Sequence, residues 1–289
     1  MMKEHSMGSE NKPSSSFDWA AERGSKWQAQ LGGMEATLAP VDEPLIQALQ
    51  LDAPYRIADV ACGGGGTTLK LFRQAPAGSV VEGFDISQPL IESARARAQQ
   101  EGCPVLFTRA DIAATPPPGA PYARLVSRFG VMFFEDPPAA FRNLARWLAP
   151  GGRFVFAVWS RPADNPWTST VRDAVVDVVD VPAAASDAPG PFRYAQVDML
   201  LPLLEHAGFA GVEAREWRGS LPVGGGLAAS EAASFALSAF SVGERLAETD
   251  EAGRKAAHRS LTDRFAQHER DGVVRLDACV HLVTGTRAG

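Results

Sequence analysis

Four consecutive glycines, Gly63 to Gly66, interrupt an otherwise regular part of the chain. Residues 57–61 before them are apolar and rich in strand formers, and residues 67–73 after them have helical spacing. Glycines let a ligand approach the backbone closely, and a helix N-terminus offers unpaired N–H groups with the positive end of its dipole. A strand, a tight loop and a helix in this order therefore predict a ligand-binding loop.

Two phosphate-binding motifs can be tested directly on this loop. A P-loop needs lysine after its last glycine, but Thr67 follows Gly66 and the nearest lysine is Lys70, so this motif is absent. A dinucleotide fingerprint beginning at Gly63 needs a third glycine where Thr68 stands, which weakens a dinucleotide site. The loop is better suited to a ligand without a pyrophosphate.

Asp85 ends the next apolar segment, residues 80–85, about 20 residues after Gly65. In doubly wound folds an acid at this place accepts hydrogen bonds from the hydroxyls of a ribose. A lone Asp before a helix can also be a turn or cap residue. Its distance from the glycine loop favours the ribose interpretation for Asp85.

The segments that would position these residues alternate between strand and helix from residue 55 to residue 160. Ser87 is expected to cap the second helix. Such alternation predicts an α/β fold, Rossmann-like, with a mostly parallel sheet, helices on both faces and ligands at the carboxyl edge. Strands are predicted over residues 57–61, 80–85, 105–109, 123–127 and 153–159, and helices over 67–73, 89–101 and 137–148.

Changes of pattern divide the chain into parts, and the helical insertions are expected to cover the ligand edge. In the last part we expect a helix over 196–207, a strand near 211–217 and a final strand over 278–286. The parts are a disordered tail (1–16), an N-terminal helical segment (17–54), a ligand-binding core (55–160), a cap insertion (161–195) and a C-terminal part of the core (196–289) with a helical insertion over 227–275.

Five large apolar residues stand where this topology could bring them to one edge. Met132 follows the fourth predicted strand, Trp159 ends the fifth, and Trp167 comes shortly after it. Trp19 and Trp27 recur at helical spacing near the N-terminus. Each suits core packing as well as a pocket wall, and an aromatic wall there would favour a planar or cationic ligand.

Composition excludes several other functions. The formal net charge of −6 argues against general nucleic-acid binding, which needs a basic stripe. No apolar run reaches the roughly 20 residues of a membrane-spanning helix, and no cleavable leader is visible, so a cytoplasmic location without membrane attachment is expected. The three cysteines are far apart and no ligand spacing predicts a metal site. No catalytic base stands out, and the oligomeric state is left open.

Four segments resemble those of class I S-adenosylmethionine-dependent methyltransferases, and the resemblance covers roughly residues 55 to 160. The chain is most similar to the small-molecule branch that includes the ubiquinone and menaquinone biosynthesis methyltransferases. The resemblance implies a seven-stranded sheet whose strand 7 is antiparallel and lies beside strand 5. The segments are Asp59-Val60-Ala61-Cys62-Gly63-Gly64-Gly65, Gly83-Phe84-Asp85-Ile86-Ser87, Ala110-Asp111-Ile112 and Leu148-Ala149-Pro150-Gly151-Gly152.

When the roles known for the family are transferred to the matching positions, the resemblance implies roles for the residues of the glycine loop and for Asp85. Ala61, Gly63 and Gly65 would lie against the methionine and ribose parts of S-adenosylmethionine. Asp59 would order the loop, and Asp85 would bind the ribose hydroxyls. The family usually has glycine where this chain has Ala61, and the added methyl is tolerable if the backbone there avoids positive φ.

The resemblance assigns the adenine and methionine ends as well. Ile86 would lie on the adenine face, Asp111 would accept a hydrogen bond from the adenine amino group, and the Ile112 N–H would reach a ring nitrogen. The residues just past the fourth strand, Ser127, Arg128 and Phe129, would border the methionine end and the substrate.

The implied function is transfer of a methyl group from S-adenosylmethionine to the O, N or C atom of a small molecule, mainly by positioning the acceptor. The apolar and aromatic content of the insertions favours an apolar or aromatic acceptor. An NAD(P)-dependent oxidoreductase is an alternative, because the sheet, glycine loop and Asp85 are shared, although Thr68 and Asp111 count against it. A protein that binds S-adenosylmethionine without methylating is a second alternative.

Overall fold

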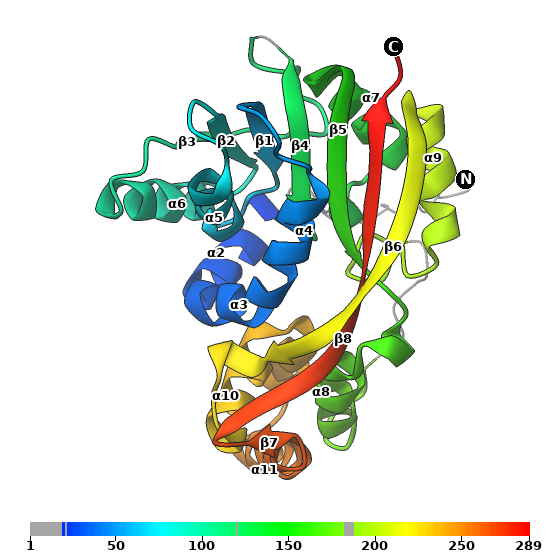
Figure 1. Ribbon diagram of the computed structural model, residues 1–289. Helices are drawn as coiled ribbons and strands as arrows, with labels where there is room; N and C mark the ends of the chain where they lie inside the picture. The colour runs from blue at the N-terminus through cyan, green and yellow to red at the C-terminus, as the bar shows by residue number, and fades with distance from the viewer. Residues whose placement is uncertain (1–18, 21, 120, 182–187) are drawn as a thin grey trace, which may run out of the picture.

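The computed structural model describes residues 19–20, 22–119, 121–181 and 188–289 (Figure 1). The predicted disordered tail therefore lies outside the described residues. The main path of the sheet has the strand order β3-β2-β1-β4-β5-β8-β6. These strands are β1 (Arg56–Val60), β2 (Val80–Asp85), β3 (Leu106–Arg109), β4 (Tyr122–Arg128), β5 (Leu148–Trp159), β6 (Phe209–Pro222) and β8 (Val273–Arg287).

Strand directions confirm the predicted Rossmann-like sheet. β1 pairs in parallel with β2 and β4, and parallel pairing continues outward to β3 and β5. β8 is antiparallel to both neighbours, β5 and β6, which is the expected place and direction of the seventh strand. A two-residue strand, β7 (Glu269–Arg270), pairs with β8 and was not predicted.

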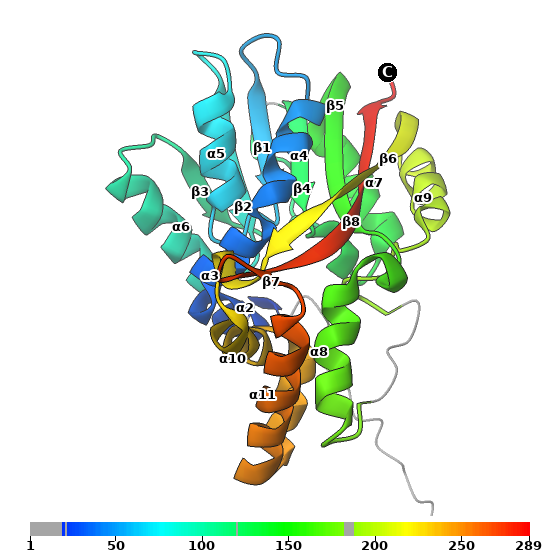
Figure 2. The ribbon, with the colours of Figure 1, turned by 60° about the horizontal axis from the view of Figure 1, so that its bottom comes forward.

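Helices cover both faces of this sheet, as Figures 1 and 2 show. α4 (Asp42–Ala48) and α5 (Gly66–Gln74) touch each other on one face, and α7 (Pro137–Trp147) touches α9 (Leu201–His206) on the other. α6 (Gln88–Gln100) packs on β2 and β3. The N-terminal segment adds α2 (Glu22–Ala29), α3 (Leu31–Leu38) and a 3-10 turn, η1 (Ala39–Val41).

A two-stranded ribbon carries the cap beyond the sheet. β5 pairs with β8 as far as Trp159 and Val280, whereas β6 stays paired with β8 from Trp217 as far as Pro222 and Arg275. The ribbon runs diagonally away from the core to the helices at the bottom of Figure 1. These cap elements are α8 (Pro166–Val176), α10 (Ala229–Ala239), the 3-10 segment η6 (Ser241–Glu248) and α11 (Glu251–Ala266).

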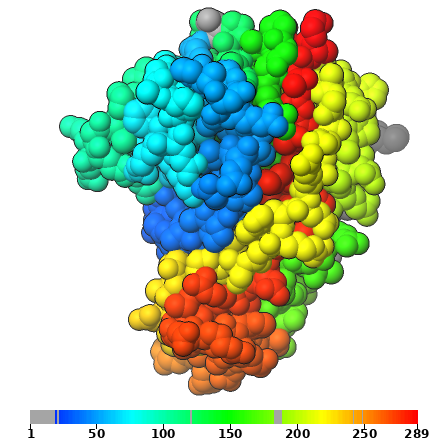
Figure 3. Space-filling view, in the orientation of Figure 1, coloured from blue at the N-terminus to red at the C-terminus, as the bar shows by residue number. Residues whose placement is uncertain are grey.

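The cap has an apolar cluster of its own. Val171 of α8, Ala232 of α10 and Phe265 of α11 are almost completely buried in it, together with Leu276 from the β8 ribbon. α3 bridges the core and this cap, because it also packs against the 3-10 turn η5 (Val223–Gly225) that follows β6. In the space-filling view the N-terminal helices meet the turn after β6 without a break (Figure 3).

Three local expectations need correction. The helix expected over 196–207 is a 3-10 turn, Val197–Met199, followed by the short α9, because Pro202 favours a helix start near itself. The strand near 211–217 is the middle of the longer β6. Ser87 is the N-cap residue of α6 but its hydroxyl makes no capping bond. Gly24 of α2 packs so closely on it that an added Cβ would lie 2.2 Å from Ser87 Oγ.

Among the described helices, none combines the length and the apolar composition needed to cross a bilayer.

Candidate functional site

A cavity of about 810 Å³ lies at the carboxyl edge of the parallel strands. Its wall contains the residues that follow β1, β2 and β3, and it continues through the segments after β4 and β5. α2 and the cap elements α8 and η6 complete the wall. The predicted ligand edge of the core and the cap therefore enclose one common space.

Hydrogen bonds join Asp85 to the glycine loop. The Gly63 N–H donates to Asp85 Oδ2 at 2.8 Å, and the Ser87 N–H donates to Asp85 Oδ1 at 2.9 Å. Burial raises the pKa of the Asp85 carboxyl, and the backbone N–H groups that it accepts from oppose this rise. Each carboxylate oxygen accepts more than one hydrogen bond, so the group can also accept from a ligand. A Cβ placed on Gly63 would meet no atom within 4 Å, which leaves open space beside the loop.

Ala61 adopts a left-handed backbone with φ +56°, so the condition under which its methyl group was expected to be tolerable is not met. Residues with a Cβ pay a steric cost in this region, and glycine does not. The methyl fits because Gly130 stands opposite: a Cβ there would lie 2.2 Å from the Ala61 Cβ. Phe129, which precedes Gly130, is also left-handed, with φ +63°, so two of the residues that line the cavity have a strained backbone.

We expect Ala61→Gly to raise the free energy of unfolding by about 0.5–1 kcal/mol, because it removes the Cβ that disfavours positive φ. Chemical denaturation measures this change. Ala58→Gly is the matched control: Ala58 is fully buried inside β1, and glycine in a strand interior destabilises. Two changes of the same sign would contradict the assigned role of backbone strain at Ala61.

Asp59 is the most deeply buried carboxyl of the glycine-loop region, at 1% exposure. Burial raises its pKa to about 7, although the hydroxyl of Thr68, which donates to Asp59 Oδ2 at 2.6 Å, opposes the rise. Thr68 belongs to the first turn of α5, so this bond ties the end of β1 to the helix after the loop. The ordering of the loop by Asp59, which the family resemblance implies, stays a prediction, and the bond to Thr68 is the contact on which it depends.

An ion pair beside the loop was not foreseen from the sequence. Arg128 Nη1 donates to Asp42 Oδ1 at 2.8 Å, and the side chains of the two residues are 11% and 6% exposed. Asp42 also accepts from the Thr67 hydroxyl at 2.9 Å. Arg128 therefore fixes the first turns of α4 and α5 against the end of β4. The two residues are 86 positions apart in the sequence, so no local sequence pattern indicates that they form a contact.

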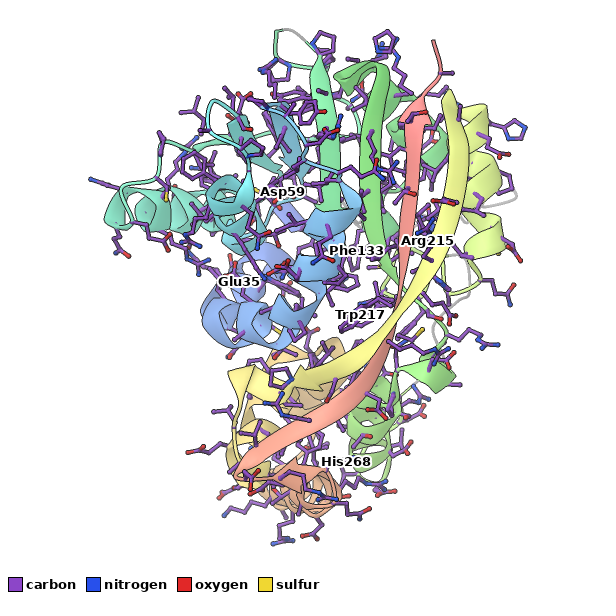
Figure 4. The ribbon with its side chains drawn as sticks, in the orientation of Figure 1. Glu35, Asp59, Phe133, Arg215, Trp217 and His268 are labelled. Atoms are coloured by element: carbon purple, nitrogen blue, oxygen red, sulfur yellow. The ribbon has the colours of Figure 1, made fainter. Side chains whose placement is uncertain are left out.

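Glu35 is a second carboxylate that sequence reasoning missed. It reaches from α3 to the glycine loop, where Gly66 N–H donates to Glu35 Oε1 at 3.2 Å. Arg97 of α6 pairs with Glu35 and also donates to the Gly64 carbonyl at 3.2 Å. Figure 4 shows Glu35 on α3 and Asp59 on the core side of the same region. The N-terminal segment thus supports the loop directly.

Aromatic side chains form the other side of the cavity. Phe129 stacks on Trp159 with ring centroids 4.2 Å apart and an interplanar angle of 8°. Trp167 of α8 follows at 5.2 Å from Trp159, and Trp19 lies 5.8 Å from Trp27. All five rings line the cavity, so they serve as pocket wall as well as packing. This surface suits an apolar, planar ligand.

The structure brings most of the predicted site residues together, but it separates two of them from the cavity. Gly65 makes room for packing instead: a Cβ there would lie 2.7 Å from the Phe107 ring and 3.0 Å from Ala94. Ser127 is completely buried inside β4. The residues that do line the cavity are Asp59, Ala61, Gly63, Asp85, Ile86, Asp111, Ile112, Arg128, Phe129, Trp19, Trp27, Met132, Trp159 and Trp167.

Histidine does not contribute to the described cavity wall. His268 lies at the far end of the cap (Figure 4), and His206 contacts the Pro202 carbonyl in α9. Within the described part of the chain, no group of three or more His, Cys, Asp and Glu side chains is arranged to hold a metal ion. The chemistry that this wall offers is hydrogen-bond acceptance by carboxylates, charge from arginine and lysine, and apolar positioning.

Residues 57–152 match a family model described as a methyltransferase domain. This part of the chain is similar to a methyltransferase domain. The same part holds the glycine loop, Asp85, Asp111 and Phe129, whereas α2, the β6–β8 ribbon and the cap lie outside it.

The first curated relative is similar to this chain in sequence over less than half of the chain's length. Demethylmenaquinone methyltransferase from Thermus thermophilus is 39% identical over 110 residues, which are 38% of this chain and 50% of the relative. The chain thus spans about half the length of the first curated relatives that it matches.

Two solved structures resemble the fold over 96% of this chain. Phosphoethanolamine N-methyltransferase 2 from Haemonchus contortus, in complex with S-adenosyl-L-methionine, has a TM-score of 0.56 at 13% identity, with 61% of that chain covered. The [4+2]-cyclase SpnF has a TM-score of 0.56 at 15% identity, with 98% of that chain covered. Both likenesses support the fold of this chain. At 15% and 13% identity they show the fold alone and not the activity.

Proposed function

We propose that this protein binds S-adenosylmethionine and transfers its methyl group to a small-molecule acceptor. The observation that carries the proposal is the buried Asp85 carboxylate, held by the Gly63 N–H and facing the same cavity as Asp111 and the aromatic wall. In doubly wound folds a carboxylate at the end of this strand accepts hydrogen bonds from the hydroxyls of a ribose. The methyltransferase-domain match over residues 57–152 supports the same conclusion.

The residues present fit this cofactor. Asp85 would hold its ribose, Ile86 and Ile112 would contact its adenine, and Asp111 would accept from the adenine amino group. The open space beside Gly63 would admit the remainder of the nucleoside. When bound, the cofactor supplies an electrophilic methyl group on its sulfonium.

This chain contributes positioning and exclusion of water. The stacked rings of Phe129 and Trp159 give a rigid apolar surface against which an acceptor can be aligned, and Trp167 closes the cap side. Alignment in a closed site supplies on the order of 7–11 kcal/mol of barrier reduction at best, so an acceptor that is already nucleophilic needs no base from the protein. A cytoplasmic location belongs to the same proposal.

One observation favours a second candidate, a protein that binds the cofactor and guides a different reaction. The fold resembles the [4+2]-cyclase SpnF along nearly the full length of both chains, and that protein is named for a cyclisation. The alternative of an NAD(P)-dependent oxidoreductase has weaker support. Thr68 stands where the dinucleotide fingerprint needs its third glycine, and its hydroxyl donates to Asp59.

Binding and turnover together test these alternatives. Calorimetric titration with S-adenosylmethionine, S-adenosylhomocysteine and NAD⁺ should show tight binding of the first two. Release of S-adenosylhomocysteine is then followed with a panel of apolar and aromatic acceptors that carry hydroxyl, amino or acidic carbon nucleophiles. Tighter binding of NAD⁺ would overturn the proposal, and cofactor binding without turnover on any acceptor would favour the second candidate.

We expect Asp85→Asn to weaken S-adenosylhomocysteine binding by at least about tenfold, because a charged acceptor of buried hydrogen bonds becomes a neutral amide. Calorimetry measures the affinity, and thermal unfolding shows that the variant is folded. Asp277→Asn is the matched control, since Asp277 is an exposed carboxylate on β8. Equal affinity in wild type and Asp85→Asn would remove Asp85 from the binding site.

A further inference from the structure

The N-terminus of α5 holds a carboxylate that comes from the protein itself. Gly66 is the first residue of α5, and its N–H donates to Glu35 Oε1 at 3.2 Å. The unpaired N–H groups and the positive dipole end of a helix N-terminus attract an anion, and in doubly wound folds the helix after the first strand binds a pyrophosphate there. Glu35 therefore supplies from within the chain the negative charge that a ligand phosphate supplies in those folds.

Two glycines of the loop make room for α3, which carries Glu35. A Cβ on Gly66 would lie 2.6 Å from Glu35 Oε2, and a Cβ on Gly64 would lie 2.5 Å from Leu31 Cδ2. Both distances are too short for a real side chain, so α3 can pack on the loop only because these positions are glycine. In a phosphate-binding loop such glycines let the ligand approach the backbone closely, whereas here they admit a helix of the same chain.

Arg97 of α6 fixes the position of the Glu35 carboxylate. Its guanidinium pairs with Glu35 Oε2 and donates to the Gly64 carbonyl at 3.2 Å. The side chains of Arg97 and Glu35 are 28% and 15% exposed, so solvent screens this charge less than it would on the surface. Among the described residues, Glu35, Gly63 and Gly64 line the cavity and Arg97 does not. A ligand beside the loop therefore faces the carboxylate and not the guanidinium.

The basic residues around the loop are engaged by carboxylates of the protein. This engagement leaves a phosphate group at the loop to compete with an existing partner for each of these cations. The pairs are Arg97 with Glu35, Arg128 with Asp42 at 2.8 Å, and Lys70 with Glu43 at 3.9 Å.

We propose that Glu35 determines the specificity of the cofactor site: it fills the anion position at the N-terminus of α5, so the site accepts a nucleoside without phosphates and rejects nucleotides and dinucleotides. The inference rests on the proposed function, because it names the class of adenosine ligand that this site selects. Glu35 acts in two ways. It accepts from the Gly66 N–H that a phosphate oxygen would use, and its charge repels the phosphate.

Two ligands that share one nucleoside separate charge from shape. 5′-Methylthioadenosine is neutral, whereas ADP carries phosphates on the same ribose carbon. Calorimetric titration of wild type should show that methylthioadenosine binds at least about tenfold more tightly than ADP, because the phosphates of ADP would lie beside the Glu35 carboxylate.

The salt dependence of wild type tests the sign of the interaction. Added salt screens a repulsion, so it should reduce the preference for methylthioadenosine over ADP. If the phosphates were instead held by a basic residue, salt would weaken ADP binding and increase the preference. An increase of the preference with salt would therefore contradict the repulsion by Glu35.

Two variants should change this preference in opposite directions. Glu35→Gln keeps the size of the side chain and removes its charge, so most of the preference should disappear, and Arg97 is released as a partner for the phosphates. Arg97→Gln leaves the carboxylate without its cation, so the preference should increase. Glu92→Gln is the matched control, because Glu92 is an exposed carboxylate on α6 outside the described cavity wall.

A purely structural role of Glu35 gives a different result. Loss of the contact between α3 and the loop would weaken both ligands together and leave the ratio of their affinities unchanged. If thermal unfolding shows that Glu35→Gln does not fold, the salt dependence of wild type and the titrations of Arg97→Gln still decide.

Three results would overturn the proposal: equal binding of the two ligands by wild type, tighter binding of ADP, or an unchanged ratio of affinities in folded Glu35→Gln. Failure of S-adenosylhomocysteine to bind wild type, with a preference that depends on Glu35, would count against the proposed function alone. Tight binding of NAD⁺ would overturn both.

Discussion

Arg128→Met should lower the free energy of unfolding by about 3–5 kcal/mol, because it leaves the Asp42 carboxylate buried without its cation. The side chains are 11% and 6% exposed, and the pair is formed at 2.8 Å. Asp42 would keep only the Thr67 hydroxyl among the partners described above. Chemical denaturation at neutral pH measures the loss.

Two further variants separate the buried charge from the packing of the side chains. Arg128→Met combined with Asp42→Leu removes both charges, and it should recover most of the lost stability, because apolar replacement of a buried pair is often neutral. Arg215→Met is the matched control: Arg215 pairs with Glu213 at 3.2 Å, but the side chains are 78% and 52% exposed, and such surface pairs contribute about 0–1 kcal/mol. Equal losses in Arg128→Met and Arg215→Met would contradict the role given to burial.

The same ion pair shows where sequence reasoning stops. The order of strands and helices from residue 55 to residue 160 follows from periodicity, glycine and proline signals, and the structure confirms it. Asp85 could be placed because its distance from the glycine loop is short and fixed by the βαβ unit. Asp42 and Glu35 belong to helices earlier in the chain, and nothing local indicates that they reach Arg128 and the loop.

Backbone geometry is the second limit. The family resemblance indicates that Ala61 stands where glycine is usual, but only the structure shows that φ is +56° and that Gly130 makes room for the methyl group. Gly65 shows the reverse case, because its place in the glycine run predicted contact with a ligand and the structure uses its missing side chain for packing against Phe107. Residue type gives the permitted conformations, and tertiary contacts decide which of them is used.

The sequence predicted a cap insertion over the ligand edge, but it did not predict how the cap is attached to the core. Its helices have apolar faces that require a partner, and the partner is supplied by a ribbon of β6 and β8 that extends past the sheet. Pairing over such a long distance in sequence brings Arg172 and Trp167 to the cavity. The composition of the cap side of the cavity wall therefore became visible only in three dimensions.

Asp59 should make the folded protein lose stability as the pH rises from about 4 to about 7. Burial raises the pKa of this carboxyl to about 7 from an ordinary value of 3.8. Between these values the folded state keeps the proton and the unfolded state has lost it, so the unfolding free energy falls by about 1.4 kcal/mol per pH unit. The contribution is complete below the lower pKa and absent above the higher one, and it amounts to roughly 4 kcal/mol at most.

Asp59→Asn isolates this effect, because the amide has the size of the protonated carboxyl and does not ionise. The oxygen of the amide can still accept from the Thr68 hydroxyl, which preserves the link between β1 and α5. The difference in unfolding free energy between wild type and Asp59→Asn should therefore shift in favour of the variant as the pH rises from about 4 to about 7. Asp277→Asn, at an exposed carboxylate, should give a curve parallel to wild type. Parallel curves for wild type and Asp59→Asn would show that Asp59 is ionised in the folded protein throughout this pH range. The carboxyl group beside the glycine loop would then be charged.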